Sequence, residues 1–194
     1  MTDDAADAFR HRTVLSDGSV FRVVPVETGV RAIRAWAEHP WPMSPAQALA
    51  LRDRLGWTSS PTDEEMLTTD HGIGEKDAWF IAVEAGGDSR TVSSFRMSLT
   101  SRIPKPVRAE AVPTAERAFN AYVEALTAVY GQGARSRSRG VLSVKWTPPN
   151  DTLVDIGTVG RVVSVDVDSP ALNEAARGEA QYFAEIADEN DPAR

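Results

Sequence analysis

Three aspartates near the end of the chain have a spacing that could support chemistry. Asp166 and Asp168 lie two residues apart in the run Val-Asp-Val-Asp, and Asp155 belongs to the preceding apolar segment. Paired carboxylates can exchange a proton with a substrate or supply oxygen ligands to a divalent cation. Because side chains alternate across a strand, the valines of this run should face a core and the aspartates should face outward. A solvated sheet face is the favoured interpretation, and a functional acid cluster is the alternative.

A histidine lies in the segment Thr-Asp-His-Gly-Ile-Gly, which has the composition of a turn. Asp70 could orient His71 as a general base, and Glu75 adds another acid just beyond. No Ser-centred nucleophile motif and no glycine-rich phosphate loop accompanies this histidine. His11 and His39 are too distant from it in sequence to form a metal-binding signature. We therefore expect a turn histidine without a catalytic role, no catalytic residue, no metal site and no cofactor.

A short basic stripe interrupts an otherwise acidic chain. Arg135, Arg137 and Arg139 alternate with serines immediately before an apolar segment that starts at Val141. Guanidinium groups in such a stripe could bind an acidic partner or a phosphate. A solvated loop is the simpler interpretation of the same residues.

Composition excludes several classes of protein. The 194 residues carry 28 acidic and 21 basic side chains, so the formal charge of −7 disfavours nucleic acid and suits a basic protein partner. The chain has no cysteine, which rules out disulfides and thiolate chemistry. Its acidic start is unlike a secretory signal, and no apolar run is long enough to span a membrane. We expect a cytoplasmic protein that does not bind membranes.

Turn and cap signals divide the chain into elements. Asp17-Gly18 predicts a hairpin between strands at 13–16 and 19–26, and apolar spacing predicts a short helix over 29–38. Ser44, Pro45 and Gln47 form a capping-box pattern at the start of the next helix, which should end before Gly56. The following segment, 58–76, has only a weak extended pattern around Glu65.

The second half of the chain has stronger patterns. Two strands at 78–84 and 91–102 are predicted by alternation, and a long apolar stripe predicts a helix capped by Thr114 and closed by Gly131. Three further strands are predicted at 141–146, 153–156 and 161–167. A last helix should begin at Ser169-Pro170 and should place the following apolar side chains on the sheet: Leu172, Ala176, Tyr182, Phe183 and Ile186.

This order predicts an α+β fold. The elements run hairpin-α-α-β-β-α-β-β-β-α, without the crossover helices that a parallel sheet needs. We therefore expect an antiparallel sheet of about five to seven strands with helices packed mainly on one face. A single domain should cover 13–188, between a flexible N-terminus at 1–12 and a flexible acidic tail at 189–194.

Several of these features resemble a known family. The chain resembles an actinobacterial family of unknown function that is often encoded beside type VII-exported toxins. Four features carry this resemblance: the run from His39 to Trp57, the loop His71-Gly-Ile-Gly, the helix end at Gly131 and the helix start at Ser169-Pro170. The resemblance covers roughly 30–188. The element order also looks like that of secretion-chaperone-like domains, whose members mostly bind proteins. The N-terminal hairpin departs from that plan.

The resemblance implies protein binding without catalysis. The expected function is that of an immunity-type protein, whose acidic face blocks the basic cleft of a cognate toxin. A chaperone for an exported effector is one alternative, and a small hydrolase or metal-dependent enzyme is another. The residues expected to contact a protein partner are the following charged and polar ones: Asp70, His71, Glu75, Asp155, Asp166, Asp168, Arg135, Arg137 and Arg139.

Overall fold

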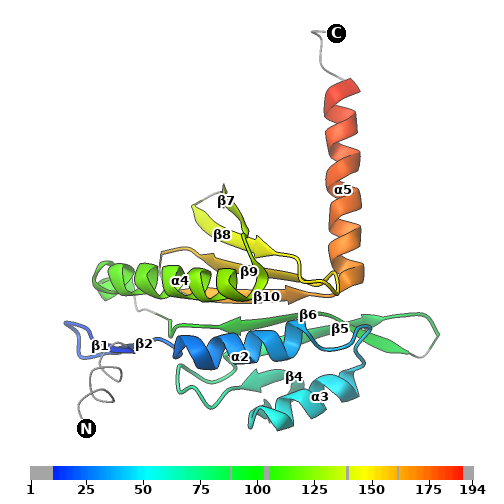
Figure 1. Cartoon of the computed structure of the whole chain (residues 1–194). Coiled ribbons are helices and arrows are strands. Elements are labelled where there is room, and N and C mark those ends of the chain that lie inside the picture. Colours follow the sequence, from blue (N-terminus) through cyan, green and yellow to red (C-terminus); the bar gives the residue numbers. More distant parts are fainter. Residues whose placement is uncertain (1–10, 88, 103–104, 139, 161, 190–194) are drawn as a thin grey trace.

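One antiparallel sheet of eight strands organises the chain, as the computed structural model shows (Figure 1). The structure describes residues 11–87, 89–102, 105–138, 140–160 and 162–189. The strands are β3 (Thr58–Ser60), β4 (Asp63–Thr68), β5 (Ala78–Glu84), β6 (Arg90–Ser98), β7 (Ala134–Ser138), β8 (Val141–Trp146), β9 (Leu153–Thr158) and β10 (Val163–Asp168). Their order in the sheet is β3-β4-β5-β6-β10-β9-β8-β7. The predicted α+β class is confirmed, with a larger sheet than expected.

Alternation of side chains gives this sheet two different faces. Val163, Val165 and Val167 of β10 are fully buried, whereas the serine and the aspartates between them lie on the opposite face. A separate hairpin of β1 (Arg12–Val14) and β2 (Val20–Arg22) turns at Gly18, whose φ of +81° suits glycine. The predicted hairpin is confirmed, although its strands are shorter than the expected 13–16 and 19–26, and the outward orientation of the aspartates is confirmed.

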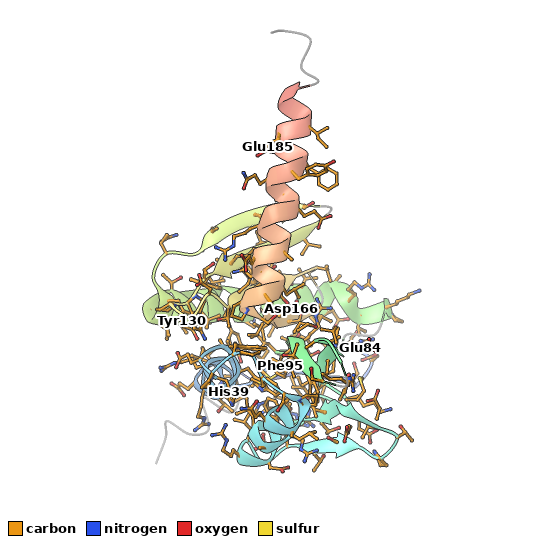
Figure 2. The ribbon with its side chains drawn as sticks, turned by 90° about the vertical axis from the view of Figure 1, so that its right-hand side faces the viewer. His39, Glu84, Phe95, Tyr130, Asp166 and Glu185 are labelled. Atoms are coloured by element: carbon orange, nitrogen blue, oxygen red, sulfur yellow. The ribbon has the colours of Figure 1, made fainter. Side chains whose placement is uncertain are left out.

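Helices cover one face of the sheet. α2 (Val26–Ala37) and α4 (Arg108–Tyr130) lie against it, and α3 (Pro45–Arg54) packs near its β4–β6 end (Figure 1). Between sheet and helices, Trp36 stacks on Phe95 with ring centroids 4.0 Å apart, and both side chains are fully buried. Figure 2 shows Phe95 in the middle of this densely packed region. Large aromatic side chains dominate the apolar area that such a core removes from water.

One helix begins at the N-cap predicted from the sequence, and another helix does not. Ser44 caps α3 in a complete capping box with Gln47, as predicted. The long helix α4, however, begins at Arg108 after a 3-10 turn (Lys105–Val107), so Thr114 is not its N-cap. Pro113 lies inside α4 close to its start. A proline at this position cannot donate to the carbonyl of Ala109, so α4 lacks one intrahelical hydrogen bond there.

Two strands were not predicted, and both lie at edges of the sheet. Within the described residues, β3 pairs with β4 alone and β7 pairs with β8 alone. β7 contains Arg135 and Arg137. The sequence favoured a solvated loop for this segment, but the segment is a strand in which all five residues are exposed. As an edge strand, β7 presents an outer row of backbone N–H and C=O groups that have no partner strand in this sheet.

The last helix, α5 (Pro170–Glu189), does not pack on the sheet as expected. It leaves the end of β10 and stands clear of the body, with Glu185 far from the sheet (Figures 1 and 2). Tyr182 is 61% exposed and Phe183 is 60% exposed, and their rings contact each other. Ser169 caps the helix through its hydroxyl, which accepts from the Leu172 amide. Of the helices in the described ranges, none has the length and apolar character to cross a bilayer.

Removal of most of α5 is expected to leave the fold intact. A chain that ends at Ala176 keeps buried Asn173, whose amide donates to the Asp151 carbonyl, and loses mainly exposed side chains. We expect the free energy of unfolding in urea to fall by less than about 1 kcal/mol, because little apolar area is exposed. Phe119→Ala in the core is the positive control and should cost about 3–5 kcal/mol. A loss as large as the control would show that α5 is part of the core.

Candidate functional site

A ladder of charged side chains crosses the face of the sheet opposite α2 and α4. Strand register places five residues side by side on five neighbouring strands, in the order Trp79, Arg96, Asp166, Asp155 and Lys145. Directly opposed side chains on neighbouring strands are close enough to interact. Asp155 of β9 and Asp166 of β10 are therefore directly opposite each other on neighbouring strands.

Each aspartate of the ladder is held by a cation. Arg96 donates to both carboxylate oxygens of Asp166, from Nε to Oδ1 and from Nη2 to Oδ2 at 2.7 Å, and its guanidinium lies over the Trp79 ring at 5.5 Å. The Lys145 ammonium lies 3.3 Å from Asp155 Oδ2. Two-point contact between guanidinium and carboxylate fixes both side chains in orientation. The ladder is thus a preorganised set of charges.

A row of small residues runs beside the ladder. Ser98, Ser164, Gly157, Ser143 and Ser136 face one another across β6, β10, β9, β8 and β7. Because these side chains are short, the sheet surface is hollowed here to a volume of about 910 Å³. We call this depression the serine hollow. A Cβ built on Gly157 would make only ordinary contacts, at 3.8–3.9 Å, so the structure has room for a side chain at this position. Because glycine has no side chain, this room adds to the depth of the hollow.

The wall opposite the ladder combines apolar and basic side chains. Val141, Val159 and Val162 line it, and Val159 is 48% exposed. Arg102 and Arg108 line the same hollow and, within the described ranges, form no ion pair. The Nε of Arg108 is buried and makes no hydrogen bond. This wall therefore carries two guanidinium groups that no carboxylate of the described residues neutralises.

Asp168 lies next to the ladder on β10 and behaves differently from its neighbours. It faces Ser94 on β6 and Leu153 on β9 rather than a cation. Burial, with a further contribution from Asp166 and Asp155, raises the pKa of Asp168 to about 6. Burial also raises the pKa of Asp155, against the opposing effect of Lys145. Asp168 is thus the carboxyl group of this face that could exchange a proton near neutral pH.

Replacement of Asp168 by asparagine is expected to stabilise the protein above pH 6. The folded-state pKa of Asp168 lies above its usual 3.8, so its contribution to stability is present below about pH 4 and is lost as pH rises through 6. After allowance for its partial exposure, the gain should be on the order of 1 kcal/mol at pH 8 and smaller at pH 4.5. Urea unfolding at both pH values measures it, with exposed Glu124→Gln as the control. An equal effect at both pH values would contradict the raised pKa.

The histidine segment lies outside the serine hollow. The His71 side chain is 6% exposed and packs edge-on against Trp57, with ring centroids 5.8 Å apart. Its Nδ1 lies 3.0 Å from Asp70 Oδ1, which is the expected pairing, but Nε2 is buried without a hydrogen-bond partner. Burial lowers the pKa of His71. Glu75 lies on the exposed turn that follows.

The arginine stripe lies on the other face of the sheet. Arg135 and Arg137 are opposite Val144 and Leu142 of β8, whereas the Ser136 between them belongs to the serine hollow. Arg139 lies outside the described residues. The described candidates named from the sequence thus lie in three places: the histidine turn, the face of β7 that carries the arginines, and the open face with Asp155, Asp166 and Asp168.

Sequence patterns missed most of the residues that build this surface. Alternation along the predicted strand at 91–102 gives Arg96 and Ser98 the same orientation, but no sequence pattern joins them to Lys145, Arg102, Arg108 or the other serines. Across the described residues, no group of three or more His, Asp or Glu side chains is arranged to hold a metal ion. The arrangement offers fixed charges and hydrogen-bond donors around a depression, which suits binding.

Comparison with known proteins identifies a family. Residues 27–169 match the model of a family of unknown function, DUF6301. The chain belongs to this family. The DUF6301 match spans the whole eight-stranded sheet with its ladder and serine hollow, and leaves out the β1–β2 hairpin and all of α5. No curated protein and no solved structure matches the chain. Resemblance to a family of unknown function is confirmed over this range, and its link to exported toxins stays a prediction.

Proposed function

We propose that the chain is a non-catalytic protein-binding domain and that the open face of the sheet is its binding surface. One observation carries the proposal. α2 and α4 pack on one face of the sheet, and the opposite face presents the charge ladder and the serine hollow to solvent. An unpartnered face of this kind, hollowed and lined by oriented polar groups, is a natural site for a partner.

The composition of this face supports a protein partner. Its polar centre is bordered by exposed apolar side chains, with Ile81 and Val83 on β5 and Val141 and Val159 near the other end. Interfaces between proteins combine such apolar contacts with hydrogen bonds and charged groups. Six strands from β5 to β7 span about 24 Å at the usual separation, which is wide enough for a segment or helix of another protein.

The proposed biological role is that of an immunity protein that binds and blocks a cognate toxin. Blocking requires no chemistry from the inhibitor, only a surface that occupies the site of its partner. The ladder supports this role because its side chains are fixed before binding, so less conformational entropy is lost on association. The sequence predicted an acidic contact surface, whereas the proposed face carries two carboxylates and two cations in its ladder and two further arginines in the hollow.

Affinity purification tests this role. The tagged full chain would be recovered from its native lysate, and stoichiometric partners would be identified by mass spectrometry and purified. We expect a folded protein domain whose activity is lost when the chain is added at equal concentration. A partner that keeps its full activity when saturated with the chain would contradict the immunity role.

A chaperone for an exported effector is the second candidate, and the free edge of the sheet supports it. β7 pairs only with β8, so its outer backbone groups could add a strand from an extended segment of a client protein. The two roles differ in the captured region. An immunity protein should bind a folded toxin domain, whereas a chaperone should bind an unfolded or N-terminal export segment.

A small hydrolase is the third candidate, and Asp168 is the observation in its favour. A partly buried carboxyl group with a pKa near 6 is suited to general acid or base catalysis. Asp168→Asn would abolish turnover in such an enzyme. In the binding role that we favour, this variant should retain partner binding.

A further inference from the structure

We infer that the serine hollow receives an acidic segment of the protein partner and binds its carboxylates between Arg102, Arg108 and the serine row. This inference rests on the proposed protein-binding function and names the chemistry of the segment that enters the open face.

The charges of the hollow leave two cations without partners. Among its lining residues, Arg96 is paired with Asp166 and Lys145 with Asp155. Arg102 and Arg108 remain, and they have no carboxylate partner in the described part of the chain. The hollow therefore carries positive charge although the whole chain has a formal charge of −7.

Hydrogen-bond donors point to the same kind of ligand. Arg108 Nε is buried without an acceptor, and a buried donor that lacks a partner costs about 1–3 kcal/mol. The hydroxyl groups of Ser98 and Ser164 also make no hydrogen bond within the described residues. A carboxylate can accept from guanidinium and hydroxyl groups together, and bonds to an ionised acceptor are roughly twice as strong as neutral ones.

The remaining walls favour a peptide carboxylate over a nucleic acid. Asp155 and Asp166 lie in the same hollow and would repel a continuous row of phosphates, as would the net charge of the chain. Val141, Val159 and Val162 offer apolar contacts to the rest of a peptide. The serine row crosses five strands, about 19 Å, which matches an extended segment of about six residues.

A titration of the full chain with a model peptide tests the inference. The probe is acetyl-Glu-Gly-Glu-Gly-Glu-Gly-amide at low salt, and the control peptide has glutamine in place of glutamate. Amide and arginine Nε resonances would be followed by ¹⁵N NMR. We expect the acidic peptide to shift the signals of Ser136, Gly157, Ser164 and Arg108, and the glutamine peptide to leave them in place. Equal shifts with both peptides, or no shift with the acidic one, would overturn the inference.

Matched double variants locate the binding charges. R102Q/R108Q should weaken binding of the acidic peptide at least tenfold, whereas R135Q/R137Q, with the same loss of charge on the opposite face, should change it less than twofold. If both variants weakened binding equally, the loss of affinity would be explained by the change in net charge alone, and the inference would be overturned.

The same variants separate this inference from the proposed function. If a purified partner binds R102Q/R108Q as tightly as the original chain, the acidic-segment inference fails and the protein-binding function stands. If no protein binds the open face at all, the proposed function itself fails.

Discussion

Gly157→Val is expected to weaken partner binding at least tenfold while the fold is retained. Gly157 lies in the middle of the serine row, and its missing side chain contributes to the depth of the hollow. A valine there would project into the space that the partner segment occupies. A tenfold loss corresponds to about 1.4 kcal/mol, which is reached easily when a bulky group blocks a fitted contact. Isothermal titration with the purified partner measures it.

The fold should tolerate this valine for local reasons. The nearest atoms to a Cβ at this position are the Leu142 carbonyl oxygen, Val141 Cγ1 and Ser143 Cβ, none closer than 3.8 Å. Valine also favours strands, where glycine is unfavourable. Gly157→Ala is the graded control and should weaken binding less than the valine does. Unchanged affinity in a folded Gly157→Val chain would remove the serine hollow from the interface.

Gly29→Ala is expected to destabilise the protein by about 2–4 kcal/mol, although alanine normally favours a helix. Gly29 lies on the buried face of α2, and a Cβ there would be 2.1 Å from the Tyr122 hydroxyl and 2.7 Å from two of its ring carbons. Tyr122 of α4 is fully buried and donates to the Val24 carbonyl at 2.9 Å. The helices must separate or this hydrogen bond must break, and either change is costly. Urea unfolding measures the loss.

A second helical glycine provides the control. A Cβ at Gly178 in α5 would have no neighbour within 4 Å. Gly178→Ala should therefore leave stability unchanged or raise it by at most about 1 kcal/mol. If Gly29→Ala proved as harmless as Gly178→Ala, the close packing of α2 on α4 would be wrong.

Elements with a buried side could be predicted from the sequence. The valines of β10 alternate with polar residues, so both the strand and the outward direction of Asp166 and Asp168 were predictable. The capping box at Ser44 and the turn at Gly18 were predictable because their chemistry is local. These signals need no information from distant parts of the chain.

The elements that were missed have no such local signal. β7 is exposed at every position, so its sequence carries no apolar alternation, and β3 is a three-residue strand of threonine and serines. The apolar spacing of α5 predicted packing on the sheet, but the direction in which the chain leaves β10 carries the helix away from it. The ladder and the serine row depend on the register of five strands, a tertiary property that no short segment encodes.

Cysteine footprinting tests the central claim most directly, because the natural chain contains no cysteine and each single substitution reports one position. S164C would place a thiol on the floor of the serine hollow, and E116C would place one on exposed α4 behind the sheet. Alkylation rates would be compared with and without the purified partner. We expect the partner to slow the reaction of S164C at least tenfold and leave that of E116C unchanged. Protection of E116C with S164C unaffected would show that the partner binds elsewhere.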